Sequence, residues 1–369
     1  MDPPVLTDIG GAGPNAKGQS AQKAKMGAVK AIIMPLGLWS GNRLHFIGGV
    51  SRLMDVILHI GAHRTGTTTF QTYLEDNRDH LNEIGTEFWG PNRTRSGLFS
   101  GLVKRPDKVN RDAQRRGERA NGLIRMELDR LEQVGLASLV VSEENMIGSM
   151  WDNLSTARLY GDAQARLDRF ASGFGFHCKR VAISIRSYDK YWASVLAFMV
   201  QRGWKAPDDG LLDRLVTQSR RWQDVIRDVA AVFPAAELVV WPFEGFVGQS
   251  DQQLAMINNG RVPVMMRGRR DWHNASPSCA KIRKVFLDRG NHAAADRLRD
   301  DYSRWQPFGT DHIAAFQGQY DEDIAWLRGG ADGLATYVEN TDSGPAGIHL
   351  RPWEMERGHS NDQQERSMG

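Results

Sequence analysis

The stretch VILHIGAHRTGTTTF, residues 56–70, decides how the fold of this chain is interpreted. An apolar, β-branched run ends at Gly61, and a second glycine, Gly66, opens a run of threonines. The glycines have the spacing of a phosphate-binding loop, G-x-x-x-x-G-K-[ST], but Thr67 stands where that pattern has lysine. A strand that feeds such a turn and then a helix directs backbone N–H groups and the positive end of the helix dipole at one point. The stretch therefore predicts a strand, an anion-binding turn and a helix.

Side chains in the turn add to this anion site. The threonines after Arg64 supply hydroxyl donors, and Arg64 places a cation inside the turn instead of after its second glycine. The alternative is a tight connection in which the glycines serve backbone geometry alone. We favour anion binding because spacing, donors and cation coincide. The residues concerned are Arg64, Thr65, Gly66, Thr67, Thr68 and Thr69.

Four apolar, β-branched runs predict an α/β domain with a central, mainly parallel sheet flanked by helices. They lie at residues 55–61, 137–144, 180–187 and 237–244. Helical spacing follows the first run from Phe70 to Ile84 and the third from Tyr188 to Met199. Further helices are predicted at about residues 111–134, 211–232, 280–300 and 311–328. Each of the first two helices thus begins where ligands of open α/β sheets bind.

The predicted domain covers residues 54–342, between two segments of different composition. Residues 1–53 are rich in Gly, Ala, Pro and Lys, and we interpret them as a disordered extension or an upstream misreading, with Met54 as the true start. Residues 343–369 form a polar tail that we expect to be disordered.

Composition excludes several classes of protein. A net charge of +3 in 369 residues marks no nucleic-acid-binding surface. Cys178 and Cys279 lack the spacing of a zinc site, so we expect reduced, structural thiols and no metal. The apolar run Ala31–Trp39 is too short to span a bilayer, and we predict a cytoplasmic protein without stable membrane insertion.

The motif HRTGTT, residues 63–68, resembles the 5'-phosphosulfate loop of sulfotransferases that use 3'-phosphoadenosine 5'-phosphosulfate (PAPS). That family has the pattern Pro-Lys-[Ser/Thr]-Gly-Thr-[Ser/Thr]. His63 departs from the proline and Arg64 from the lysine, which in the family bridges to the leaving phosphate. Arginine keeps the charge but has a bulkier, forked geometry. The matching positions are Thr65, Gly66, Thr67 and Thr68.

A second motif also resembles that family, whose cofactor 3'-phosphate is bound by a strand-end arginine and a serine eight residues on. Arg186 and Ser194 have this spacing, at the end of the third predicted strand and on the helix after it. Alone, Arg186 would be interpreted as a surface ion pair and Ser194 as a neutral helix residue. VVSEEN and VVWPFEGF resemble other strands of bacterial members. The resemblance covers about residues 54–328 and implies a P-loop-like sulfotransferase architecture.

The resemblance implies transfer of a sulfuryl group from PAPS to a hydroxyl or amine of a small-molecule or glycan acceptor, a saccharide or lipid. The product is adenosine 3',5'-bisphosphate, and no metal is required. Arg64 would neutralise charge on the leaving oxygen while the loop amides, Thr67 and Thr68 hold the phosphosulfate. The alternatives are a divergent nucleotide-dependent kinase and a catalytically silent anion-binding protein.

The reaction requires a base at a strand end, which in this family is a histidine or a glutamate. Glu144 is the first candidate and Glu143 the alternative, since strand alternation sends only one of the pair toward the site. Both carboxylates would otherwise balance nearby arginines. His63 competes as base from within the loop, whereas His59 is expected to be a satisfied core residue.

Two basic segments are candidates for ligand contacts. Residues 92–120 carry nine Lys or Arg against three acidic residues, and we interpret them as a solvated surface loop or as a mobile flap facing an acidic saccharide or lipid headgroup. Residues 267–278 resemble the family's C-terminal segment that closes over the cofactor.

Overall fold

The computed structural model describes residues 54–264, 266–268 and 276–340, so the predicted N-terminal extension, the C-terminal tail and most of the second basic segment lie outside the described residues. Within these ranges, six strands form one all-parallel sheet in the order β2-β3-β1-β4-β5-β6. The strands are β1 (Asp55–His59), β2 (Thr86–Trp89), β3 (Ser138–Ser142), β4 (Cys178–Ile185), β5 (Glu237–Pro242) and β6 (Thr336–Tyr337).

The four strands predicted from apolar runs are confirmed as β1, β3, β4 and β5, which form the centre of the sheet. The sequence analysis missed β2 and β6, the two edge strands. Each is very short, and β6 is half exposed, so neither carries the long apolar run that marks a central strand.

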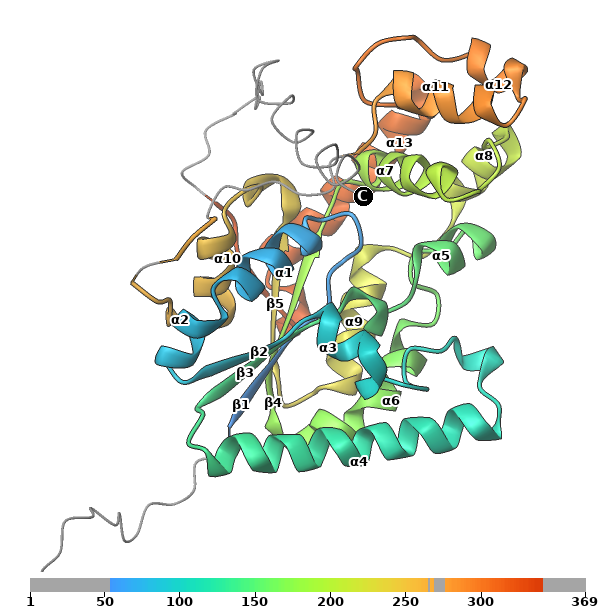
Figure 1. Cartoon of the computed structure of the whole chain (residues 1–369). Helices are drawn as coiled ribbons and strands as arrows, with labels where there is room; N and C mark the ends of the chain where they lie inside the picture. The colour runs from blue at the N-terminus through green and yellow to red at the C-terminus, as the bar shows by residue number, and fades with distance from the viewer. Residues whose placement is uncertain (1–53, 265, 269–275, 341–369) are drawn as a thin grey trace, which may run out of the picture. The chain divides into compact units, whose positions relative to one another are not determined.

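Side chains of the sheet alternate between two hydrophobic cores. Val56 and Leu58 of β1 face one core, and Ile57 between them faces the other. The first face is covered by α4 (Arg111–Gln133), α6 (Ala163–Phe174), α9 (Trp222–Val232) and α13 (Thr310–Arg328). The second is covered by α1 (Thr67–Asp76), α2 (Arg78–Glu83) and α10 (Ser250–Ile257) (Figure 1). This arrangement is an α/β domain with helices on both faces of a parallel sheet.

The remaining helices are α3 (Pro91–Arg93), α5 (Met150–Thr156), α7 (Tyr188–Gln201), α8 (Asp209–Thr217), α11 (Cys279–Asp288) and α12 (His292–Asp296). The predicted helices at 111–134 and 311–328 are confirmed as α4 and α13. Three other predicted helices are each split in two, at Asn77, at residues 218–221 and at residues 289–291. At the first break the Asn77 side chain donates to the Tyr73 carbonyl and so ends α1 locally.

The basic segment 92–120 is partly a surface loop, as its composition suggests, and partly helix and packed turns. Phe99 and Leu102 are buried in the core. Arg169 of α6 donates to the carbonyls of Gly101 and Leu102, and α4 begins at Arg111. The segment is therefore anchored to the core and to α6 by contacts that composition alone does not reveal.

The strand order creates a crevice at one edge of the sheet. The chain leaves β1 toward β2 on one side and leaves β4 toward β5 on the other, although β1 and β4 are neighbours. Loops that diverge from adjacent strands leave space at the carboxyl ends, where ligands of such sheets bind.

Cys178 and Cys279 are buried free thiols, as expected. Among the described residues, no helix has the length and apolar character needed to cross a membrane.

Candidate anion-binding and catalytic site

The turn between β1 and α1 lies against β4 at this crevice. Ala62 donates its N–H to the Ser184 carbonyl, and α1 begins at Thr67 after Gly66, which has a left-handed backbone (φ 77°) and provides no side-chain cap. A β-carbon at Gly61 would lie 2.9 Å from that of Glu144, so glycine is needed there for close approach. The first-turn N–H groups of α1 thus remain without a side-chain cap at the positive end of a helix.

The threonine hydroxyls of the turn have different surroundings. Thr65 and Thr67 are buried, and both hydroxyls donate to the Ala62 carbonyl, at 2.7 and 2.9 Å. Thr68 is exposed. The hydroxyls of Thr65 and Thr67 therefore hold the turn closed, so the donor that Thr67 could offer to an anion is its backbone N–H group and not its hydroxyl.

Arg64 connects the two motifs that were identified separately in the sequence. Its Nε donates to the Ser194 hydroxyl at 2.9 Å, across 130 residues of chain. Arg186 Nη1 donates to the Arg64 carbonyl at 2.8 Å. Ser276, at the end of the second basic segment, lies 2.7 Å from the Ser194 hydroxyl. The structure thus brings Arg64, Arg186 and Ser194 together.

Arg64 lies near the cations Arg186 and Arg202, whereas Arg186 lies near the carboxylates of Glu244 and Asp189 as well as near Arg304. Burial, with Arg186 and Arg202 adding to it, lowers the pKa of Arg64 to about 10. Burial also lowers the pKa of Arg186 to about 10; Glu244, at 3.8 Å from Nε, opposes the shift and Arg304 adds to it. Both remain charged at neutral pH. Within the described part of the chain, the buried Nε of Arg186 makes no hydrogen bond. A bound anion would stabilise this arrangement.

Aromatic rings hold these guanidinium groups in place. Arg64 and Arg202 both lie over the ring of Phe198. The distance from the guanidinium carbon to the ring centroid is 4.8 Å for Arg64 and 3.8 Å for Arg202. Arg186 lies 4.8 Å from the centroid of Phe243. Such contacts restrict where the cations point while leaving their N–H donors for a ligand.

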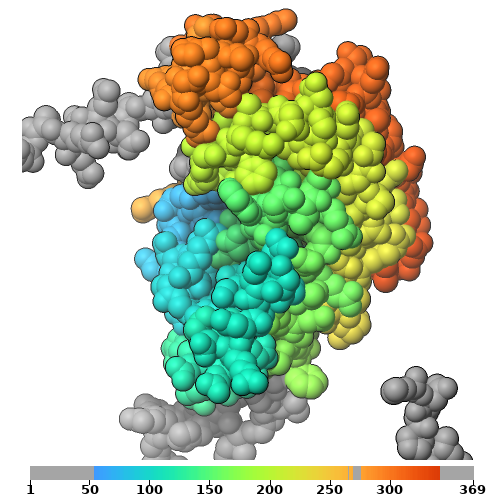
Figure 2. Space-filling view, turned by 90° about the vertical axis from the view of Figure 1, so that its right-hand side faces the viewer, coloured from blue at the N-terminus to red at the C-terminus, as the bar shows by residue number. Residues whose placement is uncertain are grey.

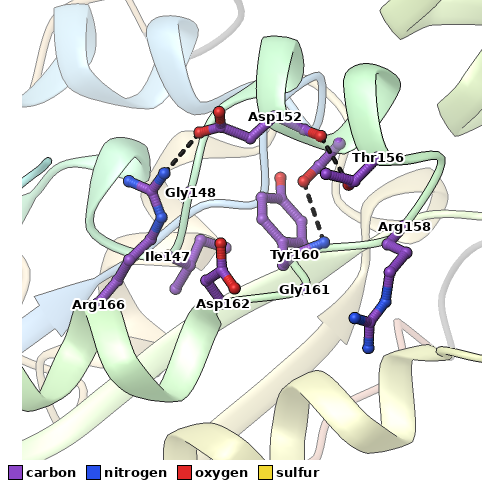
Figure 3. Close-up of a pocket in the computed structure, with 10 residues that line it drawn as sticks. Ile147, Gly148, Asp152, Thr156, Arg158, Tyr160, Gly161, Asp162 and Arg166 are labelled. Atoms are coloured by element: carbon purple, nitrogen blue, oxygen red, sulfur yellow. Dashed lines mark hydrogen bonds and ion pairs between the residues drawn. The ribbon is translucent and has the colours of Figure 1, made fainter. Parts of the chain in front are cut away.

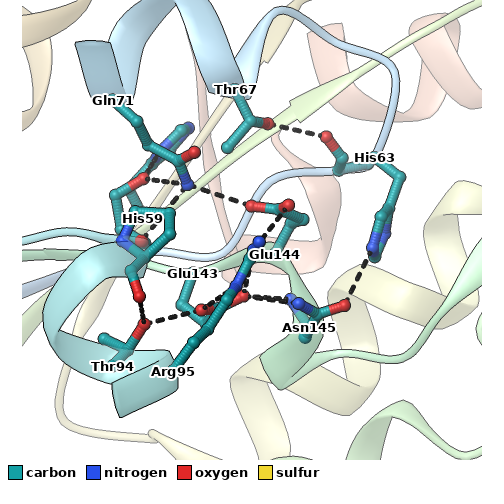
Figure 4. A network of polar contacts seen from close by, with 12 residues as sticks. His59, His63, Thr67, Gln71, Thr94, Arg95, Glu143, Glu144 and Asn145 are labelled. Atoms are coloured by element: carbon teal, nitrogen blue, oxygen red, sulfur yellow. Dashed lines mark hydrogen bonds and ion pairs between the residues drawn. The ribbon is translucent and has the colours of Figure 1, made fainter. Parts of the chain in front are cut away.

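The two candidate bases after β3 differ sharply in their surroundings (Figure 4). The Glu143 side chain is 1% exposed, and its carboxylate accepts hydrogen bonds from Thr94, Arg95 and Asn145. The Glu144 side chain is 15% exposed and accepts from Gln71 at 3.0 Å and Arg95 at 2.9 Å. The structure therefore favours Glu144 over Glu143 as a group that reaches a substrate.

The Glu144 carboxyl is ionised at neutral pH. Burial acts to raise its pKa, whereas His63 in its protonated form, Arg95 and the hydrogen bond from Gln71 act to lower it, and the net shift is below the ordinary value. A carboxylate stabilised in this way accepts a proton only when the donor has become strongly acidic. Glu144 thus fits a base that acts late, as a new bond to the acceptor forms.

His63 lies between the loop and the carboxylates. Tyr160 accepts a hydrogen bond from its backbone N–H at 2.9 Å and lies 3.0 Å from Nδ1, while Nε2 is 3.4 Å from Asn145 Oδ1. Burial lowers its pKa despite Glu144, so the ring is neutral at neutral pH. Because both nitrogens have neighbours within the protein, His63 orients the loop and is a weaker candidate base than Glu144.

His59 is a core residue, as the sequence suggested. Its Nδ1 lies 2.8 Å from the Ser142 hydroxyl, and its ring stacks on Trp241. Burial lowers its pKa to about 4.

Several residues of the site were not found by sequence reasoning. Gln71 and Arg95 bind Glu144 across 73 and 49 residues of chain, and no local pattern announces such contacts. Phe198 lies on the last turn of α7 and Arg202 caps that helix four residues later, so this spacing could have predicted the cation–π contact.

A separate cavity is lined in part by Tyr160 (Figure 3). Its charged lining consists of Asp152, Arg158, Asp162 and Arg166, and Asp152 is paired with Arg166. Since cations and carboxylates are equal in number, the cavity does not favour anions as the turn does.

No protein-family model matches this chain, and no curated protein or solved structure matches it. Within residues 54–264, 266–268 and 276–340, no group of three or more His, Cys, Asp or Glu side chains is placed to hold a metal ion.

Proposed function

We propose that this chain transfers a sulfuryl group from PAPS to a hydroxyl or amine of an acceptor, on the P-loop-like sulfotransferase architecture that its motifs resemble. The observation that carries the proposal is the contact of Arg64 with Ser194 and of Arg186 with the Arg64 carbonyl. Two motifs recognised independently in the sequence meet at the crevice of the sheet. A chance match in either motif would not require this proximity.

In the proposed binding mode, Arg186 and Ser194 contact the 3'-phosphate, and Arg64 with the first-turn amides of α1 contacts the 5'-phosphosulfate. Arg64 must then exchange its hydrogen bond to Ser194 for the phosphosulfate. The exchange is reasonable because an anion offers two charged acceptors to a forked guanidinium, whereas a serine hydroxyl offers a neutral one.

The proposed reaction is an in-line displacement at sulfur. A bond forms from the acceptor oxygen or nitrogen to sulfur, and the bond from sulfur to the 5'-phosphate oxygen breaks. Glu144 takes the acceptor proton, and Arg64 neutralises the charge that develops on the leaving oxygen. Gln71 and Arg95 hold the Glu144 carboxylate in position.

Calorimetric titration tests the cofactor directly. The wild-type chain is titrated with adenosine 3',5'-bisphosphate and, separately, with ATP plus Mg²⁺. We expect the bisphosphate to bind more tightly. A preference for magnesium-ATP would replace the proposal with a nucleotide-dependent kinase.

A catalytically silent anion-binding protein is the second candidate, and the ion pair between Arg95 and Glu144 favours it because the pair weakens the base. Labelled PAPS separates the two functions. Release of adenosine 3',5'-bisphosphate that depends on an acceptor supports transfer, whereas binding without turnover across saccharide, lipid and small-metabolite acceptors supports the silent protein.

A further inference from the structure

We propose that the exposed face of α4 binds an acidic polysaccharide that serves as the acceptor. Four arginines form this surface, which we name the arginine face: Arg111, Arg115, Arg116 and Arg119. All four side chains are exposed. The identity of the acceptor rests on the proposed function, whereas polyanion binding by this face does not.

Helical geometry places the four arginines on one side of α4. At 3.6 residues per turn they span about 140°, directly opposite the buried stripe that includes Ala113, Ile124 and Leu128. Asp112 and Glu118 lie on or beside the same side, as two carboxylates against four cations. Among the described residues, none of the four arginines forms an ion pair.

Local electrostatics oppose this placement. Arg111, in the first turn of α4, faces the positive end of the helix dipole, at about 0.3–1 kcal/mol. Arg111 and Arg115, and Arg115 and Arg119, are also like-charged pairs four residues apart, which destabilise a helix. The helix start is otherwise well formed, because the Asn110 side chain caps it by accepting from Ala113 N–H. Features that oppose local stability without a structural gain indicate a ligand.

The chain segment of residues 93–102 contacts both the candidate base Glu144 and helix α4. Arg95, at the start of that segment, binds Glu144, and Arg93 binds Glu127 of α4 at 2.7 Å. Leu102 packs against Gly117 of α4, where a β-carbon would approach it within 3.2 Å. In Figure 2 the teal surface of residues near 100 faces the viewer beside the green surface of residues near 150.

A polysaccharide fits this face better than nucleic acid or a membrane. Single-stranded nucleic acids are held by aromatic side chains that stack on bases, and the segment 111–120 contains no aromatic residue. The exposed apolar residues of α4, Leu123 and Met126, lie beyond the arginines and are too few to insert into lipid. An acidic saccharide chain combines repeated anions with the hydroxyl or amine that the proposed reaction needs.

The test is binding to a heparin oligosaccharide by titration at several salt concentrations. We expect the full-length triple variant Arg111→Gln, Arg115→Gln, Arg119→Gln to bind at least about tenfold more weakly, with a shallower salt dependence. The matched control carries Lys179→Gln, Arg214→Gln and Arg261→Gln, three exposed cations elsewhere, and should bind like the wild type. Equal loss in both triples, or no loss in either, would overturn the proposal.

Duplex DNA and vesicles containing phosphatidylserine are titrated beside heparin. Tighter binding to either, reduced by the same triple variant, would assign the face to that partner and overturn the polysaccharide. The triple variant should keep wild-type affinity for adenosine 3',5'-bisphosphate. If the wild type binds heparin through this face but does not bind the bisphosphate, the proposed function fails while the arginine face stands.

Discussion

A carboxylate cluster and an arginine cluster lie at the carboxyl edge of the same sheet, and they differ in how far the protein itself neutralises their charges. After β3, Glu143 and Glu144 share Arg95, and every oxygen of Glu143 is matched by donors within the protein. After β1 and β4, burial lowers the pKa of both Arg64 and Arg186, Arg186 lowers that of Arg64 further, and Glu244 lies 3.8 Å from Arg186. The comparison teaches that the carboxylate cluster is satisfied by donors within the protein, whereas the arginine cluster keeps the buried Nε of Arg186 without a hydrogen bond among the described residues, which is why we propose an anion ligand there.

The largest expected effect comes from Glu144→Gln. Removing the base should lower turnover by about 10²–10⁴-fold while adenosine 3',5'-bisphosphate binds as before, because the side chain belongs to the carboxylate cluster. Steady-state transfer rates and calorimetry on the same preparation check this. A wild-type rate would move the base to another residue, with His63 next to be tested.

Arg64→Ala should lower turnover by about 10²–10³-fold with the fold intact, because the charge on the leaving oxygen loses its partner. Arg261→Ala, which removes an exposed arginine outside the cluster, is the control. Unchanged turnover in Arg64→Ala would refute the mechanism, and loss of the circular-dichroism signal would show a structural role instead.

A pH effect is expected from Asp323, which lies beneath the arginine cluster. The Tyr188 hydroxyl donates to Asp323, Trp222 N–H donates to Tyr188, and the Trp222 indole donates to the Arg186 carbonyl at 2.8 Å. Burial raises the pKa of Asp323 from 3.8 to about 6, with the Tyr188 hydrogen bond and Arg221 opposing. The contribution of the protonated Asp323 carboxyl to the free energy of unfolding is therefore complete below about pH 4. This contribution is lost as the pH rises through about 6.

Two pKa units correspond to about 3 kcal/mol. Relative to the wild type, Asp323→Asn should therefore gain up to that amount in free energy of unfolding between pH 4 and pH 7. Denaturant unfolding of both proteins at each pH measures the difference. A difference that does not change with pH would show that the carboxyl keeps its ordinary pKa.

A smaller effect separates the two glutamates. Glu143→Gln should cost about 2 kcal/mol of unfolding free energy because Arg95 and Thr94 lose a charged acceptor, and Glu144→Gln should cost less because its side chain is more exposed. Thermal or denaturant unfolding of the two variants side by side checks the order. Equal costs would mean that the clusters differ less than their contacts suggest.

The smallest effect is expected at Phe198. Phe198→Leu removes the ring under Arg64 and Arg202 and should weaken bisphosphate binding by a few fold, corresponding to about 0.5–1 kcal/mol. Phe99→Leu, a change of a buried phenylalanine outside the arginine cluster, is the control for general loosening of the fold. Equal affinities in the wild type and Phe198→Leu would show that the ring does not hold the cations.

The sequence predicted the central strands and the turn because both depend on local pattern. Apolar runs identified β1, β3, β4 and β5, and the glycine spacing identified the turn that Gly66 opens toward α1. The pairing of Glu143 and Glu144 with Arg95 was not predictable, since it joins parts of the chain 48 and 49 residues apart. Helix breaks such as that at Asn77 depend on side-chain hydrogen bonds that hydrophobic periodicity does not contain.

The most direct test of the central claim compares affinities for adenosine 3',5'-bisphosphate and for AMP, which lacks the 3'-phosphate. Both ligands are titrated into the wild type and into Arg186→Ala. We predict that the wild type prefers the bisphosphate and that the variant loses this preference while its affinity for AMP stays unchanged. A preference that survives Arg186→Ala, or a wild type that binds both ligands equally, would contradict the assignment of the arginine cluster to the cofactor.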